Sequence, residues 1–219
     1  MKLYHYVHCP FCVRVRMALG FLEKEYESQV LPYDDEETPV KLCEKKMLPI
    51  VTFDDGYSSN ESLDIIARAD EENRLGTKSL LADKEKLEQM DQLLGEIGSP
   101  VHNLAMPYWI WTPEFNESSR RYFVDKKSKK RGPFHLLAQK KQQFLDELPP
   151  VLTKVQGLLT GPYYNGETLG IEDIMIASHL WGLYVIPEFQ FPNDLHRYLQ
   201  SIGNLCKFNY HEDFWRQEI

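Results

Sequence analysis

Two cysteines three positions apart, Cys9 and Cys12, are the residues of this sequence whose type and spacing best suit covalent chemistry. A Cys-x-x-Cys pair can exchange disulfides, bind zinc or be structural, so its place in the fold decides among these uses. Here the pair stands where an expected strand ends and an expected helix begins. Free backbone N–H groups and the helix macrodipole at that point favour a thiolate on Cys9. We therefore predict a nucleophilic thiol whose pKa lies below the free-cysteine value of about 8.5.

Cys12 is expected on the same helical face as Cys9, within disulfide reach and less exposed, which makes it the candidate resolving thiol. Pro10 suits the first helical turn, because its missing N–H would have had no partner there. A zinc site normally needs a second pair of ligands, and none follows at comparable spacing, so redox chemistry is favoured and no metal is expected. His8 could tune the charge of Cys9, but an exposed position without a role is the expectation.

Two further segments form a candidate ligand site with this pair. Leu48-Pro49 follows an expected helix and begins an expected strand, where a cis-proline could present the Leu48 backbone to an extended, peptide-like ligand. An ordinary trans proline at a strand start is the alternative. Asn60-Glu61-Ser62 opens the next expected helix, so its backbone N–H groups and the Ser62 hydroxyl could bind a small carboxylate. Helix capping by Asn60 or Ser62 is equally expected and is compatible with binding.

The elements that must position these residues alternate between strand and helix. Strands are expected over residues 2–7, 26–33, 48–53 and 57–59, and helices over 9–22, 38–45 and 62–69. The order strand-helix-strand-helix-strand-strand-helix predicts an α/β domain over residues 1–72.

A polar, glycine-containing stretch follows, and we predict a linker over residues 73–84. After it no strand pattern recurs with any strength, and apolar residues follow helical spacing, so residues 85–219 are expected to form an all-α domain. Residues 171–186 are apolar nearly all round, which predicts the central buried helix of that domain.

The charge pattern bears on partners. Residues 1–72 hold 8 Lys and Arg against 15 Asp and Glu, so most of the net charge of −8 lies there. An acidic chain repels phosphate backbones, so no nucleic acid partner is expected. The run Lys126–Arg131 is the one basic cluster of the sequence. A solvated helix face or loop is its first interpretation, and a docking patch for acidic partners is the alternative.

Composition limits the class of protein. The chain has 219 residues, of which 42% are hydrophobic, and this is enough for one large or two small domains. Four cysteines are too few for a disulfide scaffold, and Cys43 and Cys206 are expected to be inert, partly buried thiols. No apolar run reaches roughly 18 residues and the first residues lack a signal-peptide pattern, so we expect a cytoplasmic protein without a membrane partner.

These segments together resemble the glutaredoxin 2 family, bacterial glutaredoxins built like glutathione transferases. The matching segments span most of the chain: MKLY at 1–4 with Tyr6, HCPFC at 8–12, DDEETP at 34–39, KKMLPI at 45–50, ESLDI at 61–65, YFVDKK at 122–127 and NGE at 165–167. The resemblance implies a thioredoxin-like α/β domain, a linker and an all-α domain, with glutathione in the cleft between the domains. It also implies a monomer, although transferases of this shape commonly dimerise.

The resemblance implies roles for individual residues. Cys9 is the nucleophile and Cys12 its partner, Leu48 and Pro49 anchor the cysteinyl part of glutathione, and Glu61 and Ser62 hold the γ-glutamyl part; Phe11 beside the thiol completes the implied glutathione site. In the all-α domain, family members begin the buried helix with a Ser or Thr cap and an Asp three residues on. Here Gly170 stands at the cap, and Asp173 is expected to accept from backbone N–H groups at that turn.

The expected function is reduction of protein disulfides and protein–glutathione mixed disulfides, with glutathione as the reductant. The expected partners are therefore glutathione, protein disulfides and glutathionylated proteins. Two alternatives stay open on the same fold. One is a cysteine-type glutathione transferase or dehydroascorbate reductase, and the other is a non-catalytic interaction protein.

Overall fold

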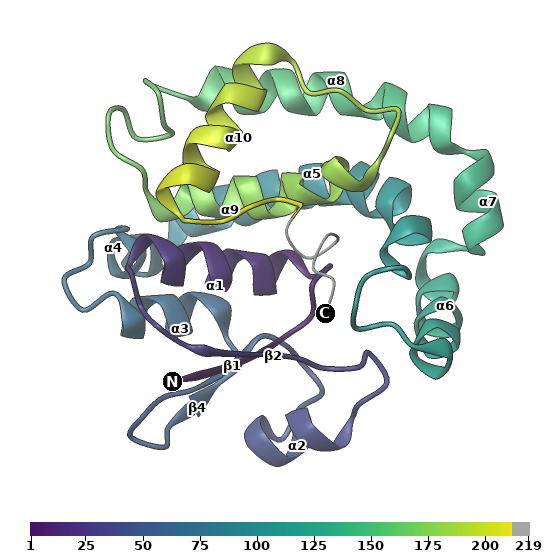
Figure 1. The fold of residues 1–219 in the computed structure, drawn as a ribbon. Coiled ribbons are helices and arrows are strands. Elements are labelled where there is room, and N and C mark those ends of the chain that lie inside the picture. The colour runs from purple at the N-terminus through teal and green to yellow at the C-terminus, as the bar shows by residue number, and fades with distance from the viewer. Residues whose placement is uncertain (212–219) are drawn as a thin grey trace.

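A mixed sheet with three helices forms the first part of the computed structural model, which describes residues 1–211 (Figure 1). The expected order of elements is confirmed, although the strands are shorter than predicted. In chain order they are β1 (Lys2–His5), α1 (Pro10–Phe21), β2 (Glu27–Val30), α2 (Glu37–Cys43), β3 (Ile50–Thr52), β4 (Ser58–Ser59) and α3 (Ser62–Ala69).

The sheet has the strand order β2-β1-β3-β4, with β1 parallel to β2 and antiparallel to β3. Residues alternate along β1, so that Leu3 and His5 are buried. Helices α1 and α3 lie between the sheet and the helical half, and α2 lies beyond the sheet (Figure 1). The crossover through α1 connects the two parallel strands and places the end of β1 directly before the first turn of α1.

The rest of the described chain is helical, as expected. Its elements are α4 (Thr77–Ala82), α5 (Lys84–Trp109), α6 (Glu117–Arg131), α7 (Phe134–Gln139), α8 (Lys141–Leu158), α9 (Ile171–Leu180), the 3-10 helix η1 (Trp181–Val185) and α10 (Asn193–Leu205). The short helix α4 lies inside the predicted linker. The proposed division into 1–72, 73–84 and 85–219 stays a prediction, and its last eight residues lie outside the described part of the chain.

Helix α9 confirms the first ten residues of the predicted buried helix, since every one of them is buried, and the predicted span continues as the 3-10 helix η1. Asp173 acts at its N-terminus as expected: its Oδ2 accepts from the Gly170 N–H at 2.8 Å and its Oδ1 from the Tyr164 N–H at 2.8 Å. The Tyr198 hydroxyl from α10 donates to the same Oδ1 at 2.8 Å. The carboxylate therefore ties the cap residue, the preceding loop and α10 to the start of α9.

The two halves pack directly against each other, with α1 alongside α9 (Figure 1). Gly20 of α1 makes a close approach possible, because a Cβ there would lie 1.9 Å from the Cys206 carbonyl oxygen. Among residues 1–211, no helix combines the length and the apolar character needed to cross a bilayer.

Candidate active site

Cys9 is the N-cap residue of α1, with extended backbone angles, and Pro10 is the first helical residue. The predicted placement of the thiol at a helix N-terminus is therefore confirmed. The Cys9 carbonyl accepts from the Val13 N–H at 2.9 Å, which starts the helical hydrogen-bond ladder. The N–H groups of the first turn have no intrahelical acceptor, so they are available to stabilise a negative charge on the sulfur.

A hydrogen bond from the Cys12 thiol is the largest cause lowering the pKa of Cys9 to about 6. Burial acts in the opposite direction, whereas His8 and the backbone N–H groups of residues 11 and 12 lower the pKa further. Cys9 is half-buried, so its sulfur can be reached from outside. At neutral pH most of it is thiolate, the reactive form.

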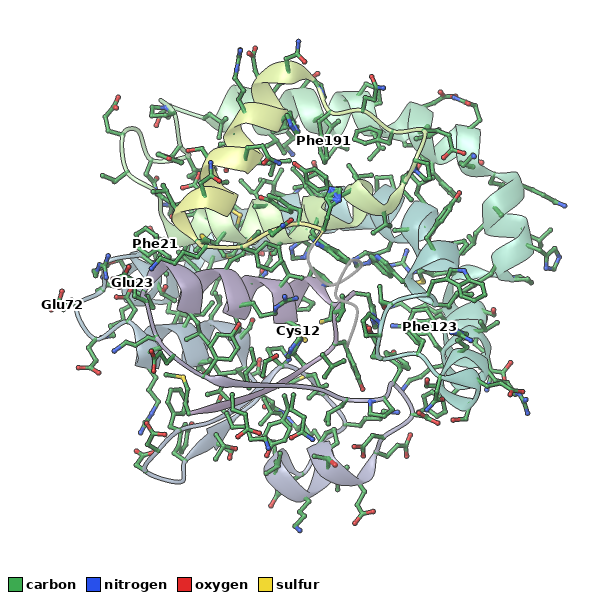
Figure 2. All side chains as sticks on the ribbon, in the orientation of Figure 1. Cys12, Phe21, Glu23, Glu72, Phe123 and Phe191 are labelled. Atoms are coloured by element: carbon green, nitrogen blue, oxygen red, sulfur yellow. The ribbon has the colours of Figure 1, made fainter. Side chains whose placement is uncertain are left out.

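Cys12, which is labelled in Figure 2, lies within α1 and differs from Cys9 in its surroundings. It is completely buried, and burial together with Cys9 raises its pKa well above the ordinary value for cysteine. Its sulfur accepts from the Tyr6 N–H at 3.4 Å. The pair thus combines one ionised, accessible sulfur with one protonated, inaccessible sulfur, as a nucleophile and a resolving thiol require.

The expectation that His8 is an exposed spectator is wrong. His8 is 5% exposed, and its Nδ1 lies 2.5 Å from Oε1 of Glu114, a residue of the α5–α6 connection. The His8 backbone N–H also donates to this oxygen, at 3.0 Å. Burial opposes ionisation of Glu114, but the hydrogen bond and charge of His8 outweigh it, so the pKa of Glu114 is lowered. The pair joins the two halves directly beside Cys9.

Aromatic rings explain why His8 is buried. Its ring packs at centroid distances between 5.2 and 5.5 Å against five other rings, which are Tyr6, Tyr33, Trp109, Phe115 and Phe123. Three of these five belong to the helical half, and Phe123 is labelled on α6 in Figure 2. Because such rings exclude water, the interaction between His8 and Glu114 is screened less than it would be at the surface.

Leu48 and Pro49 lie against the nucleophile, joined by the cis peptide bond that the sequence predicted. The Leu48 carbonyl oxygen is 3.9 Å from the Cys9 Sγ. Leu48 and Pro49 are both buried, whereas the Phe11 side chain is 46% exposed. The structure therefore places the predicted cysteinyl anchor and Phe11 around one sulfur.

Glu61 and Ser62 stand at the start of α3, with Glu61 as the N-cap residue. Neither the Asn60 nor the Ser62 side chain caps this helix, because no side-chain cap hydrogen bond forms there. Instead, the Ser62 hydroxyl accepts from Nη1 of Arg14 at 3.3 Å. Arg14 is 3% exposed, and its Nε and Nη2 are buried without a partner among residues 1–211. Burial lowers the pKa of Arg14 to about 10, which leaves it charged at neutral pH.

Two cavities meet at this site. The first, of about 610 Å³, is here called the Ser62 cavity; it is lined by Phe11, Arg14, Met47, Leu48, Pro49, Asn60, Glu61, Ser62, Leu63, Asp64 and Leu81. The second, of about 340 Å³, is here called the basic cavity; it is lined by Cys9 and by aromatic residues, with a rim of Lys46, Lys126, Lys127, Lys130 and Arg131. Phe11, Met47 and Leu48 line both cavities and form the wall between them.

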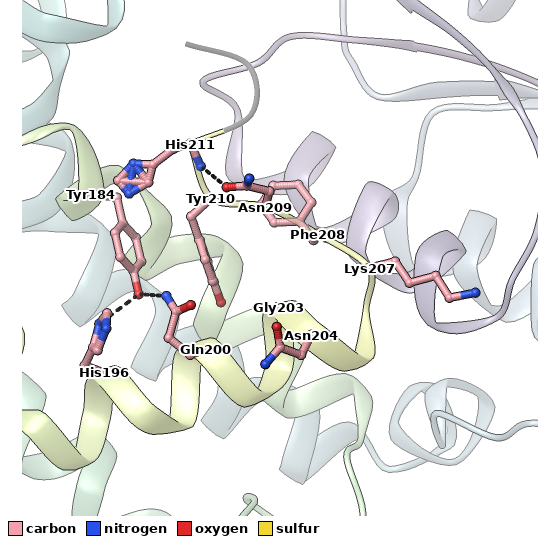
Figure 3. A pocket seen from close by; sticks show the side chains of 10 residues that line it. All are labelled: Tyr184, His196, Gln200, Gly203, Asn204, Lys207, Phe208, Asn209, Tyr210 and His211. Atoms are coloured by element: carbon pink, nitrogen blue, oxygen red, sulfur yellow. Dashed lines mark hydrogen bonds between the residues drawn. The ribbon is translucent and has the colours of Figure 1, made fainter. Parts of the chain in front are cut away.

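A third cavity, of about 580 Å³, lies over α10 and contains no cysteine (Figure 3). The Tyr184 hydroxyl is hydrogen-bonded there to Gln200 at 3.2 Å and to His196 at 3.5 Å. None of the predicted site residues lines it. Cys43 and Cys206 do not line this cavity either. Burial raises the pKa of both thiols, in agreement with the inert role expected for them. Residues 1–211 contain no cluster of three or more His, Cys, Asp or Glu side chains that could hold a metal ion.

Sequence reasoning missed Glu114 and Arg14. Glu114 is 106 positions from His8, so no local pattern connects them. Arg14 is five positions from Cys9 and reads as an ordinary helix residue. Its burial beside Ser62 depends on the packing of α1 against α3, which the sequence alone does not display.

Comparisons with known proteins agree with this geometry. Residues 89–213 match the family described as "Glutaredoxin 2, C terminal domain", and residues 3–76 match "Glutathione S-transferase, N-terminal domain". Glutaredoxin 2 of Escherichia coli (strain K12) is 30% identical over 213 residues, which cover 95% of this chain and 97% of the relative.

Solved structures extend the likeness. Glutaredoxin 2 from Salmonella typhimurium, in complex with glutathione, superposes with a TM-score of 0.82 at 28% identity and covers 95% of both chains. Glutathione transferase Omega 3C from Trametes versicolor has a TM-score of 0.58 at 16% identity, covering 94% of this chain and 87% of its own, and shares the fold. The chain thus has a thioredoxin-like domain followed by a helical domain, and it belongs to the glutaredoxin 2 family of glutathione-dependent oxidoreductases.

Proposed function

We propose that this protein reduces protein disulfides and protein–glutathione mixed disulfides, with Cys9 as the nucleophile and glutathione as the reductant. The observation that carries the proposal is the contrast between the two sulfurs. Cys9 is accessible with its pKa lowered to about 6, and Cys12 is buried with its pKa raised. A thiolate beside a protonated thiol suits stepwise disulfide exchange.

On a mixed disulfide, the Cys9 thiolate attacks the glutathione sulfur. A bond forms between Cys9 and glutathione, the bond between glutathione and the protein breaks, and the protein thiolate leaves and takes a proton from water. A second glutathione thiolate then attacks the glutathione sulfur bound to Cys9. This step releases oxidised glutathione and restores the Cys9 thiolate.

On a protein disulfide, Cys9 attacks one sulfur and becomes linked to the substrate. Cys12 then loses its proton and attacks the Cys9 sulfur, which releases the reduced protein dithiol and leaves a Cys9–Cys12 disulfide. Two glutathione molecules reduce that disulfide and leave as oxidised glutathione. Cys12 is required on this route alone.

Glutathione is proposed to occupy the Ser62 cavity. Its cysteinyl part would lie along Leu48 and Pro49 beside Phe11 and bring its sulfur to Cys9. Its γ-glutamyl part would meet Glu61 and Ser62 at the start of α3, with its carboxylate toward the Ser62 hydroxyl. Arg14 supports this placement, because two of its buried nitrogens have no partner among residues 1–211 and a carboxylate would satisfy them. The Salmonella relative, which shares the fold across both domains, was solved with glutathione.

The test is a pair of variants in a glutathione reductase-coupled assay. Cys9→Ser should reduce turnover of both substrate types to background. Cys12→Ser should retain cleavage of mixed disulfides but lose reduction of protein disulfides. Cys43→Ser is the matched control, because this cysteine lies outside the site, and it should leave both activities intact. Equal losses in both assays for Cys12→Ser would contradict the proposed roles, and conjugation of an electrophile without disulfide reduction would favour a transferase.

A further inference from the structure

One face of α6 presents its cations to the basic cavity. The residues of this helix that line the cavity include Phe123, Lys127, Lys130 and Arg131. Lys127 lies four positions after Phe123 and four before Arg131, and Lys130 adjoins Arg131, so the four share one side of the helix. Lys129, on the same helix, does not line it. The face therefore carries positive charge into a space that also contains Cys9.

These cations form no described ion pair with a carboxylate. Among residues 1–211, neither Lys127 nor Lys130 forms an ion pair or a hydrogen bond with a carboxylate. Arg131 donates to Asn103 Oδ1 at 2.7 Å and lies 3.3 Å from His102 Nδ1. The Asn103 amide carries no charge. His102 is uncharged at neutral pH, because burial is the largest cause that lowers its pKa to about 3. A chain with a net charge of −8 thus leaves these three cations without a carboxylate partner at its active site.

Lys127 lies over two aromatic rings of the cavity. Its ammonium lies 5.6 Å from the centre of the Phe123 ring and 6.0 Å from that of Tyr33, so the side chain is held over the cavity floor. Partial burial lowers its pKa, and the charge of Cys9 acts in the opposite direction. Holding a cation where water is partly excluded is unfavourable unless an anion compensates it. The Cys9 thiolate is one such anion, but its single charge does not balance the three cations Lys127, Lys130 and Arg131, so an anionic ligand would compensate the remainder.

The wall shared by the two cavities indicates where this ligand would lie relative to the reacting sulfur. With glutathione in the Ser62 cavity, its sulfur meets Cys9, which lines the basic cavity. The other half of the mixed disulfide then extends into the basic cavity. The leaving thiolate of that half also gains its negative charge there, close to Lys127.

We propose that the basic face of α6 binds carboxylate side chains of the protein half of the substrate, so that the enzyme prefers glutathionylated cysteines flanked by acidic residues. The inference rests on the proposed function and specifies its substrate class. The span from Lys127 to Arg131 is about 6 Å along the helix axis, at roughly 1.5 Å per residue. That length suits an extended acidic peptide segment, which can offer several carboxylates, better than a small thiol with a single one.

The test uses three peptides of one sequence, each with a single glutathionylated cysteine flanked by Glu, Gln or Lys pairs. In the coupled assay at low salt, kcat/KM for the Glu peptide should exceed that for the Gln peptide about tenfold and that for the Lys peptide by more, because complementary charges accelerate encounter. The preference should disappear at high salt. Equal rates for the three peptides would overturn the proposal.

Variants of α6 test which of its cations cause the preference. The double variant Lys127→Gln/Lys130→Gln should remove the preference, measured as the ratio of kcat/KM for the Glu peptide to kcat/KM for the Gln peptide, because a change in the thiol chemistry alters both rates equally. Lys129→Gln is the matched control and should keep the full preference. A preference that survives the double variant would place the selectivity elsewhere and refute the inference.

Two further substrates separate this inference from the proposed function. Both are mixed disulfides of glutathione with a small thiol and contain no peptide. The one with mercaptoethanol tests turnover, and the one with mercaptosuccinate tests the preference for negative charge. Loss of turnover on mercaptoethanol would count against the proposed function itself. A charge preference for mercaptosuccinate without one for the Glu peptide would refute binding of an acidic segment.

Discussion

The Ser62 cavity and the basic cavity meet at one wall but draw on different parts of the chain. The lining of the Ser62 cavity comes from positions 11–81, mainly the thioredoxin-like half. The lining of the basic cavity comes from both halves, with positions 6–48 on one side and 102–131 on the other. One site is thus nearly complete within the first half, and the other forms only when the halves pack together.

Their polar groups differ in the same way. The Ser62 cavity offers a helix N-terminus, a hydroxyl and one buried guanidinium, which suit a ligand of fixed shape. The basic cavity offers lysines on long, flexible side chains over an aromatic floor, which suit charge more than shape. The difference indicates that the helical half adds substrate selection to a thiol site that the first half supplies.

Among these predictions we expect the largest effect at Cys9, the thiol between the cavities, in the rate at which it reacts with iodoacetamide. With the pKa of Cys9 lowered to about 6, its thiolate is present above that pH and lost below it. At pH 6 the ionised fraction should exceed that of a thiol with the reference pKa of 9.0 roughly 500-fold. Stopped-flow alkylation of Cys43→Ser, which keeps the Cys12 thiol beside Cys9, between pH 4 and pH 10, roughly the range in which thiols titrate, should show a midpoint near 6. A midpoint near the free-cysteine value would remove the basis of the proposed function.

The side of the basic cavity formed by His8 is tested by His8→Phe. The substitution leaves the Glu114 carboxylate buried without its partner, so unfolding should become easier by about 3 kcal/mol in urea titrations. The pKa of Cys9 should rise as well, because the effect of His8 is lost. The double variant His8→Phe/Glu114→Leu should recover much of the stability but not the low pKa. Full stability of the single variant would show that the pair does not hold the halves together.

The Ser62 cavity is tested by Arg14→Met, which removes a buried charge but keeps an unbranched, apolar side chain. Loss of a buried charge pair with the γ-glutamyl carboxylate should weaken glutathione binding by about 2 kcal/mol, roughly 30-fold. Isothermal titration on Cys9→Ser, with and without the Arg14 change, measures this directly. The charge preference among glutathionylated peptides should be unaffected. Unchanged affinity would show that Arg14 does not meet the ligand.

A region away from both cavities gives the smallest effect. Asp173→Asn keeps one acceptor oxygen but loses the other, so one of the donors at the start of α9 is left without a partner. We expect a loss of stability of about 1 kcal/mol in urea titrations. Cys9 alkylation should follow the same pH profile as before. A changed profile would mean that the helical half influences the thiol beyond its contact at Glu114.

Much of this protein follows from local sequence. Strand-helix order, the buried α9 and the N-terminal position of Cys9 all depend on hydrophobic periodicity and on turn residues, which are properties of short segments. The roles of Leu48, Pro49, Glu61 and Ser62 come from resemblance and stay predictions, although the structure brings these residues to one cavity.

Only the tertiary structure decided the surroundings of the thiol. His8 is polar and adjoins Cys9, and nothing near it in sequence predicts burial, because the rings and the carboxylate that enclose it come partly from residues 109–123. Likewise, the sequence shows that Lys126–Arg131 is basic, but the packing of α6 over Cys9 determines which of these cations line the cavity. Periodicity describes which face of an element is apolar, whereas contacts between distant elements depend on how those faces pack in three dimensions.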